Sequence, residues 1–454
     1  MDILLANAPV KKPSRHAKLE PPLGLAYIAA VLRDKGYSVS VIDFNITEFD
    51  PGLLEGILKR ETPRILGISA HTETYLNGVM IANFAKQVNP DIKVVMGGTH
   101  PTILYGEVTR EKSVYVVVRG EGEYAMLELA DCIMGRREGV DLSQIKGIAY
   151  RENGVLKATP GRPFVDDPDE LPFPARDLFP LPFYKSPGNV LMSRGGCPFS
   201  CRFCAVNNIW GGKRRFRRPE KVVEEIVSIL ASGQANEIAF ADDVFTLDRR
   251  RALELLSHLR AVEGPMPLRW TCASRVDLVD RELLEEMHKA GCYAIQFGVE
   301  SGSQEILDCM AKGITIEQVR GAVRAALDVG MKVLCAFMFP QPLDTEETIR
   351  EQGRFMKELL AMGVEETLGF TTPLPGTFYY NNASMAAMHP ALADDPDADK
   401  LGITILASNW DEYDAKHLLM TGKYLSKERL ESLFEELVRD VGLTNRDAQP
   451  NSWE

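Results

Sequence analysis

The sequence predicts an α/β protein with two successive parallel-sheet domains and a small α-rich region after them. Two observations predict this class. Short runs rich in valine and isoleucine alternate with amphipathic helical patterns in two stretches of the chain, and a proline-rich segment separates the two stretches. Strands that alternate with helices form parallel sheets whose faces are covered by those helices. We therefore expect boundaries after residues 145, 188 and 377.

The first stretch, residues 1–145, predicts a Rossmann-like domain. A helix is expected to begin at Pro22 and to end at Gly36, since proline favours a helix start and glycine a helix end. Ligands of such domains bind at the carboxyl ends of the strands, and here these ends are followed by polar and glycine-rich sequences. The expected strands lie at 2–10, 38–44, 65–70, 93–98 and 115–120.

Residues 146–188 are expected to link the two domains. The segment contains a hairpin signal at Asn153-Gly154 and then many prolines, which favour an extended, semi-rigid chain. From 189 to 377, six further apolar runs alternate with helical patterns. This pattern fits either an incomplete barrel or an open doubly wound sheet. Residues 378–454 are less regular, with an exposed acidic loop expected at 394–399 and a last helix around 427–441.

Composition and charge exclude several classes of function. The 454-residue chain is 45% hydrophobic and 26% charged, as in ordinary soluble globular proteins. Its net charge of −12 argues against a nucleic-acid-binding protein, which needs a positive surface. The chain has neither an apolar run of about 18 residues, as a membrane span requires, nor a signal-peptide pattern. We therefore expect a cytoplasmic protein that binds neither membrane nor nucleic acid.

Three cysteines, Cys197, Cys201 and Cys204, lie in one glycine-flanked loop with the spacing C-x3-C-x2-C. Thiolates are the usual ligands of iron–sulfur clusters, and three of them leave the fourth iron of a cubane cluster open to another ligand. A zinc site would need further ligands, such as a second C-x2-C pair or H-x3-H, and the chain offers neither. The loop therefore predicts a 4Fe-4S cluster with these three cysteines as metal ligands and catalytic residues.

This cysteine spacing, directly after the first strand of the second domain, resembles the radical S-adenosylmethionine (radical SAM) superfamily. The resemblance implies a partial (β/α)6 barrel over residues 189–377. It also implies that S-adenosyl-L-methionine (SAM) binds the open iron, and that its reductive cleavage gives a radical that removes a hydrogen atom from the substrate. Phe203, between the last two cysteines, matches an aromatic residue common in the superfamily.

Further residues match the superfamily by their positions at strand ends, and the resemblance implies that they bind SAM. Arg275 is expected to pair with the SAM carboxylate in a charge-assisted bond, and Glu300 to accept hydrogen bonds from the ribose or the amino group. The set consists of Ala241, Asp242 and Asp243 on the second strand end, Ser274 and Arg275 on the third, Glu300 and Ser301 on the fourth, Phe337 on the fifth and Leu374 on the sixth.

The first domain resembles the cobalamin-binding (B12-binding) domain that precedes the barrel in one branch of the superfamily. The sequences PPLGL at 21–25, GGTHP at 97–101 and RGEGE at 119–123 are typical of that branch. A loop of the type D-x-H-x-x-G, which would supply a histidine ligand to cobalt, is absent. Members of the branch also bind cobalamin without such a histidine, so cobalamin remains an open question at this point.

We take radical dehydration as the main expectation for the reaction. The chain resembles the radical SAM diol dehydratase of apramycin biosynthesis, which deoxygenates an aminoglycoside sugar and relies on a separate NADPH-dependent reductase. The carboxylates of Asp242, Asp243 and Glu300 would suit a cationic amino sugar. A group must also assist the departing hydroxyl, and Lys213 and His417 are the candidates.

Two alternatives remain. The first is cobalamin-dependent radical C-methylation of a small molecule, which the N-terminal domain favours. The second is tRNA modification, which the negative net charge and the absence of cysteines for a second cluster disfavour. Under each reading the enzyme needs an electron donor, such as flavodoxin or a reductase.

Overall fold

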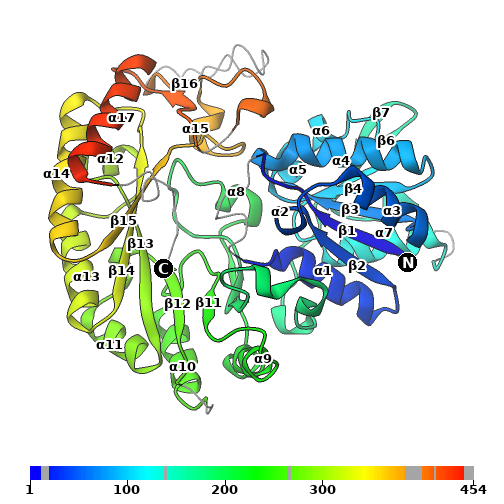
Figure 1. Cartoon of the computed structure of the whole chain (residues 1–454), viewed down its shortest axis with the longest axis horizontal. Helices are drawn as coiled ribbons and strands as arrows, with labels where there is room; N and C mark the ends of the chain where they lie inside the picture. Colours follow the sequence, from blue (N-terminus) through cyan, green and yellow to red (C-terminus); the bar gives the residue numbers. More distant parts are fainter. Residues whose placement is uncertain (12–19, 138–140, 263–266, 384–400, 414–415, 444–454) are drawn as a thin grey trace. The chain divides into compact units, whose positions relative to one another are not determined.

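A computed structural model of the protein describes residues 1–11, 20–137, 141–262, 267–383, 401–413 and 416–443. The chain divides into two compact units, Met1–Pro187 and Gly188–Glu454 (Figure 1). Each unit is built around one sheet of mostly parallel strands, so the α/β class and the two-domain order expected from the sequence are confirmed.

The first unit contains a seven-stranded sheet in the order β2-β1-β3-β4-β5-β6-β7. Helices α1 (Leu23–Asp34) and α7 (Glu123–Met134) pack together in the core on one face of this sheet. Helices α3 (Pro51–Glu61) and α4 (Tyr75–Val88) also pack against each other. The strands are β1 (Ile3–Asn7), β2 (Val39–Asp43), β3 (Ile65–Ser69), β4 (Lys93–Gly97), β5 (Val116–Val118), β6 (Ile148–Glu152) and β7 (Val155–Ala158).

The segment expected to link the domains is instead packed into the first unit. The predicted hairpin is present as β6 and β7, and β6 pairs antiparallel with β5, so residues 148–158 extend the first sheet. The proline-rich stretch that follows buries Phe179 and Tyr184 in the core of the same unit. The Tyr184 hydroxyl donates to Asp43 Oδ2 at 2.7 Å. Burial of the aromatic side chains between the prolines explains why this stretch packs against the first unit.

The second unit contains a six-stranded parallel sheet in the order β15-β14-β13-β12-β11-β8. Because neighbouring strands follow one another in sequence, the sheet winds in one direction as in a barrel (Figure 1). This order decides the alternative that the sequence pattern left open, in favour of the partial barrel. The strands are β8 (Asn189–Val190), β11 (Ile238–Phe240), β12 (Trp270–Ser274), β13 (Cys292–Glu300), β14 (Lys332–Phe339) and β15 (Glu365–Phe370).

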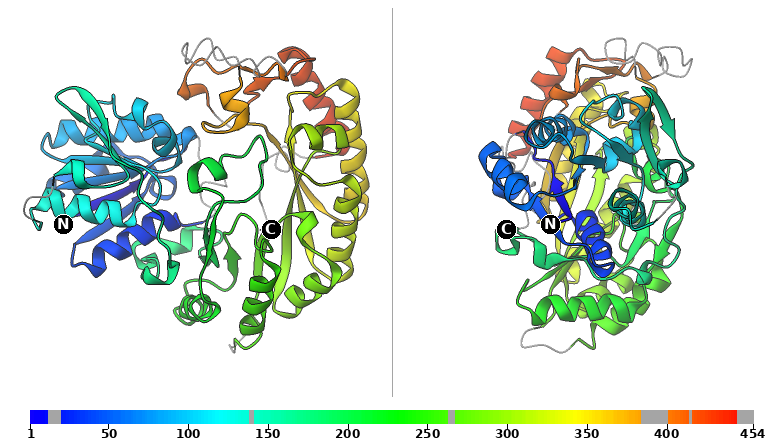
Figure 2. Two further views of the ribbon diagram at one scale, coloured as in Figure 1. Left: turned by 180° about the vertical axis from the view of Figure 1, so that it is seen from behind. Right: turned by 90° about the vertical axis from the view of Figure 1, so that its right-hand side faces the viewer.

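The two faces of this sheet differ in their side chains. On one face, alternate residues of β14, including Cys335 and Phe337, join the core with side chains of the surrounding helices. On the other face, Gly298, Ala336 and Thr367 lie side by side on three neighbouring strands. Beside Gly298 this face carries the side chains of Glu300 and Lys312, so polar groups lie at the carboxyl ends of the strands. The core helices are α9 (Pro219–Ala231), α10 (Arg249–Leu259), α11 (Arg281–Lys289), α13 (Ile316–Asp328) and α14 (Glu346–Ala361), and Figure 2 shows them along the outer side of the sheet.

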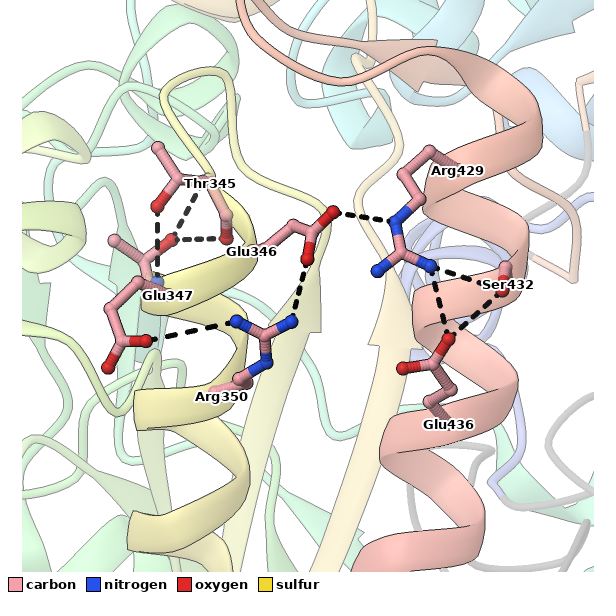
Figure 3. Close-up of polar contacts among 8 residues, drawn as sticks. Thr345, Glu346, Glu347, Arg350, Arg429, Ser432 and Glu436 are labelled. Carbon is pink, nitrogen blue, oxygen red and sulfur yellow. Dashed lines mark hydrogen bonds and ion pairs between the residues drawn. The ribbon is translucent and has the colours of Figure 1, made fainter.

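The last helix, α17 (Lys427–Val441), closes the second unit by packing against α14, and its bounds agree with the expected helix at 427–441. Its buried face carries Leu430, Leu433 and Leu437 at helical spacing. Beside this apolar contact, Arg429 Nε donates to Glu346 Oε1 at 2.8 Å across the two helices (Figure 3). The acidic run at 394–399 lies outside the described residues. No helix in the described parts of the chain is long and apolar enough to cross a membrane.

Candidate active site

The cysteine loop connects β9 (Ser193–Gly195) to the short helix α8 (Val206–Trp210), and β9 pairs antiparallel with β10 (Arg214–Phe216). The chain enters the loop through a very close backbone contact. A Cβ atom on Gly196 would lie 1.2 Å from the carbonyl oxygen of Gly211, so this position accepts only glycine. Gly196, directly before Cys197, therefore packs against the backbone of Gly211.

The three loop cysteines are partly exposed and form no disulfide. The Cys204 amide donates to the Cys201 carbonyl at 3.1 Å, which makes a tight turn between them. Burial raises the pKa of the Cys201 thiol above its usual value and that of Cys204 to about 11. The charges of Lys312 and Arg275 act on Cys201 in the opposite direction and lower its pKa. Binding of iron as thiolates must therefore release protons here.

The three thiols come from one short loop, as ligands of a cluster can. Cys197, Cys201 and Cys204 lie within eight residues of one loop, and a backbone hydrogen bond closes the turn between Cys201 and Cys204. In a cubane cluster each thiolate binds a different iron, and three thiols from one short loop suit it.

Residues 241–243 follow β11, and the structure gives them different roles. Both carboxylate oxygens of Asp242 are engaged inside the protein: one accepts from the Met192 amide at 2.8 Å and the other from the Ser193 hydroxyl. Burial raises the pKa of Asp242 to about 6. The Ala241 amide donates to the β8 strand. Asp242 thus fastens the strand ends beside the cysteine loop, and only Asp243 is exposed.

Ser274 is the last residue of β12 and Arg275 follows it, and both are buried. The hydroxyls of Ser274 and Thr246 are hydrogen-bonded to each other. All three guanidinium nitrogens of Arg275 have partners within the protein. Two bind the carboxylate of Asp277, at 2.9 and 3.0 Å, and one of these also donates to the Lys312 carbonyl at 2.7 Å. The third, Nη1, lies 3.9 Å from the Sγ atom of Cys201. Arg275 is therefore a neighbour of the cysteine loop.

Glu300 and Ser301 lie at the end of β13, where the register with β14 shifts. Glu300 has a φ of 72°, an uncommon conformation for a residue with a side chain. Its Oε1 atom accepts from Lys312 Nζ at 2.9 Å, and both side chains are nearly buried. Ser301 is buried and accepts a hydrogen bond from the Ser303 amide at 3.2 Å. The glutamate expected to meet SAM therefore has a cationic partner of its own.

The two residues expected in an adenine pocket lie in different surroundings. Phe337 is 2% exposed and belongs to the core on the helix-covered face, so its side chain does not point to the open face. Leu374 is partly exposed in the turn after β15, and its carbonyl accepts from the Thr377 amide at 3.0 Å. The two acid–base candidates, Lys213 and His417, are both exposed.

Sequence reasoning missed Lys312 and Asp277, which hold two of the predicted residues in place. Lys312 lies shortly after the short helix α12 (Gln304–Cys309), and a lysine there reads as a solvated charge at a helix end. Its burial, at 6% exposure, is what distinguishes it. No local pattern predicts that burial, because Glu300 reaches Lys312 only through the tertiary fold.

The first unit presents its own ligand-binding edge. Its strand order places the topological switch point between β1 and β3, where ligands of such sheets bind. Next to β3, Gly98 has a φ of 103°, and a Cβ there would lie 2.4 Å from the Ala70 carbonyl oxygen. This glycine lets the chain ends after β3 and β4 pack closely together at that edge. His100 is buried against the Tyr75 ring, and burial lowers its pKa to about 3, so it serves as a neutral core residue.

Comparison with known proteins agrees with this architecture. Residues 17–130 match the B12 binding domain, and residues 193–356 match the radical SAM superfamily. An uncharacterised methyltransferase of Pyrococcus horikoshii, PH0819, is 33% identical over 442 residues, which cover 96% of this chain and 91% of that protein. The chain belongs to the radical SAM superfamily, in the branch that carries an N-terminal B12-binding domain.

Two further proteins extend the comparison. The anaerobic magnesium-protoporphyrin IX monomethyl ester cyclase of Rubrivivax gelatinosus is 30% identical over 348 residues, covering 74% of this chain and 62% of that protein. The structure of the radical SAM methyltransferase TsrM from Kitasatospora setae, with cobalamin and a 4Fe-4S cluster bound, has the same fold. Its TM-score is 0.73 at 19% sequence identity, with 98% of this chain and 90% of that chain covered.

Membership of the superfamily makes this chain an enzyme that uses a 4Fe-4S cluster and SAM, as the cysteine loop predicted. The relatives reported above are methyltransferases and a cyclase. They favour the methylation alternative over the dehydration that was the main expectation from the sequence.

Proposed function

We propose that this chain is a cobalamin-dependent radical SAM methyltransferase that acts on a carbon of a small molecule. The observation that carries the proposal is the 33% identity to a methyltransferase over nearly the full length of both chains, which includes both units. The B12-binding match over residues 17–130 supplies a place for the methyl carrier. The cyclase relative covers less of both chains, so methyl transfer is the better supported reaction.

Each of the two units would have its own role in the reaction. When bound, cobalamin supplies a methyl carrier, and the cluster with SAM supplies a radical that activates the substrate carbon. In the first unit, the carboxyl edge of the sheet, at the switch point between β1 and β3, would receive the corrinoid. In the second, Cys197, Cys201 and Cys204 would hold the cluster. SAM and a small substrate would bind at the carboxyl ends of the strands, beside the Glu300–Lys312 pair.

The substrate and the electron donor are also part of the proposal. The net charge of −12 supports a small-molecule substrate over an RNA. We expect electrons to come from a flavodoxin or a comparable reductase. Dehydration of an amino sugar, with a separate NADPH-dependent reductase, is the less supported reading, because Asp242 and Glu300 are engaged with protein partners rather than free to bind a cationic sugar.

Corrinoid binding tests the role of the first unit. The chain, reconstituted anaerobically with hydroxocobalamin and passed through a desalting column, is expected to retain corrinoid absorption in a stoichiometric amount. Gly98→Ala should lose this absorption, because the added Cβ displaces the backbone at the ligand edge. Gly56→Ala, in helix α3 with open space around it, is the matched control and should retain corrinoid. Failure of the wild-type chain to retain corrinoid would overturn the proposal.

The products of SAM test the reaction. Methyl transfer requires S-adenosylhomocysteine as a product, in addition to the 5′-deoxyadenosine that radical cleavage gives. Liquid chromatography of the reaction mixture distinguishes the two compounds. Corrinoid-loaded enzyme that forms 5′-deoxyadenosine but never S-adenosylhomocysteine would exclude methyl transfer and leave dehydration. Cys201→Ala should abolish 5′-deoxyadenosine, whereas Cys132→Ala, in the first unit, should not.

A further inference from the structure

Two cations lie against the two aromatic side chains of the cysteine loop. Phe199 stands between the first two cysteines, and the guanidinium carbon of Arg275 is 3.7 Å from its ring centre. Phe203 stands between the last two, and Lys312 Nζ is 5.7 Å from its ring centre. Such cation–π contacts are favourable, more so when the cation is shielded from water. Each aromatic residue of the loop thus has its own cation.

The same loop is tied by its backbone to the segment that carries Lys312. The Arg202 amide donates to the Met310 carbonyl at 2.9 Å, and the Arg202 side chain donates to the Cys309 carbonyl at 2.9 Å. Arg275 closes the arrangement by donating to the Lys312 carbonyl at 2.7 Å. Residues 309–312 therefore hold the cysteine loop and both cations as one assembly.

Each cation is fixed by the carboxylate of a neighbouring side chain. Asp277 holds two nitrogens of Arg275, and Glu300 accepts from Lys312. The Lys312 and Glu300 side chains are 7% and 12% exposed. Charges at such sites act over a low effective dielectric constant, so their influence on a neighbouring group is greater than at the surface.

We propose that Arg275 and Lys312 are positioning residues that hold two positive charges against the cysteine loop and raise the reduction potential of the cluster. The one-electron-reduced cluster carries one more negative charge, so nearby cations stabilise it more than the oxidised form. A hydrogen bond to a ligating sulfur acts in the same direction, and Arg275 Nη1 is placed to make one to Cys201. The proposal rests on the cluster and not on methyl transfer.

The test is a redox titration of the reconstituted, SAM-free chain, with electron paramagnetic resonance reporting the reduced cluster. Lys312→Met keeps the length of the side chain and removes its charge. We expect the reduced-to-oxidised ratio at a fixed potential to fall at least tenfold, which is about 59 mV for a one-electron couple. Lys312→Arg, which keeps the charge, should restore most of the shift. The iron content of each variant is measured so that only intact clusters are compared.

Glu300→Gln separates an electrostatic role from a structural one. It removes the anion and leaves the Lys312 charge uncompensated, so the potential should rise, opposite to Lys312→Met. A purely structural role would move both variants in the same direction. An unchanged potential in Lys312→Met, or shifts of the same sign, would overturn the proposal. If Lys312→Met does not retain iron, the sign of the Glu300→Gln shift decides. A wild-type chain that holds no cluster would contradict the superfamily assignment instead.

Discussion

Glu366 is expected to make the free energy of unfolding depend on pH, and one substitution tests this expectation. It lies on β15 opposite Cys335 of β14, and neither of its buried carboxylate oxygens has a hydrogen-bond partner among the described residues. Burial raises its pKa from 4.5 to about 9. At neutral pH the folded chain therefore holds a protonated Glu366, whereas the unfolded chain holds an ionised one.

The sign and magnitude follow from this difference. Between about pH 4.5 and pH 9 the folded state binds one more proton, so the free energy of unfolding falls as pH rises. Each pH unit corresponds to about 1.4 kcal/mol, which gives a loss of about 3 kcal/mol at pH 7. Glu366→Gln cannot ionise. We expect the difference in the free energy of unfolding between Glu366→Gln and the wild type to increase by about 1.4 kcal/mol, in favour of the variant, for each pH unit between about 5.5 and 8.5.

The assay is urea unfolding followed by tryptophan fluorescence. All four tryptophans lie after residue 187, so the signal reports on the second unit, where Glu366 is found. The difference between wild type and variant removes the titration of all other groups. Glu365→Gln, at the exposed neighbouring position, is the control and should run parallel to the wild type. If Glu366→Gln also runs parallel to the wild type, the buried carboxyl group is not protonated as argued.

Further predictions concern the loop and the last helix. Gly196→Ala should prevent cluster incorporation, because its Cβ would collide with the Gly211 backbone, whereas Gly212→Ala, with open space around it, should bind iron normally; iron analysis after reconstitution checks both. Leu433→Ala should destabilise the second unit by about 2–5 kcal/mol through a cavity. Arg429→Gln, which breaks half-exposed ion pairs, should cost less than about 1 kcal/mol. Equal losses in these last two variants would show that the ion pairs, not the leucines, hold α17.

The sequence predicted those features that depend on residues close together in the chain. The strands, the hairpin at Asn153-Gly154 and the last helix follow from periodicity and turn chemistry, and the cysteine loop follows from spacing. The order of the strands in the partial barrel could not be predicted in this way, because it depends on pairing between strands that are distant in the chain. The orientation of Phe337 could not be read either, since its strand is apolar on both faces. Lys312 was missed because its ion pair joins elements that only the tertiary fold brings together.

The proline-rich stretch bears on how the chain can be divided. Because β6, β7, Phe179 and Tyr184 complete the first unit, a fragment ending at residue 145 would expose an unpaired strand edge and part of an apolar core. Such a fragment is expected to aggregate. The point at which the two halves can be separated with both sheets complete lies between Pro187 and Gly188.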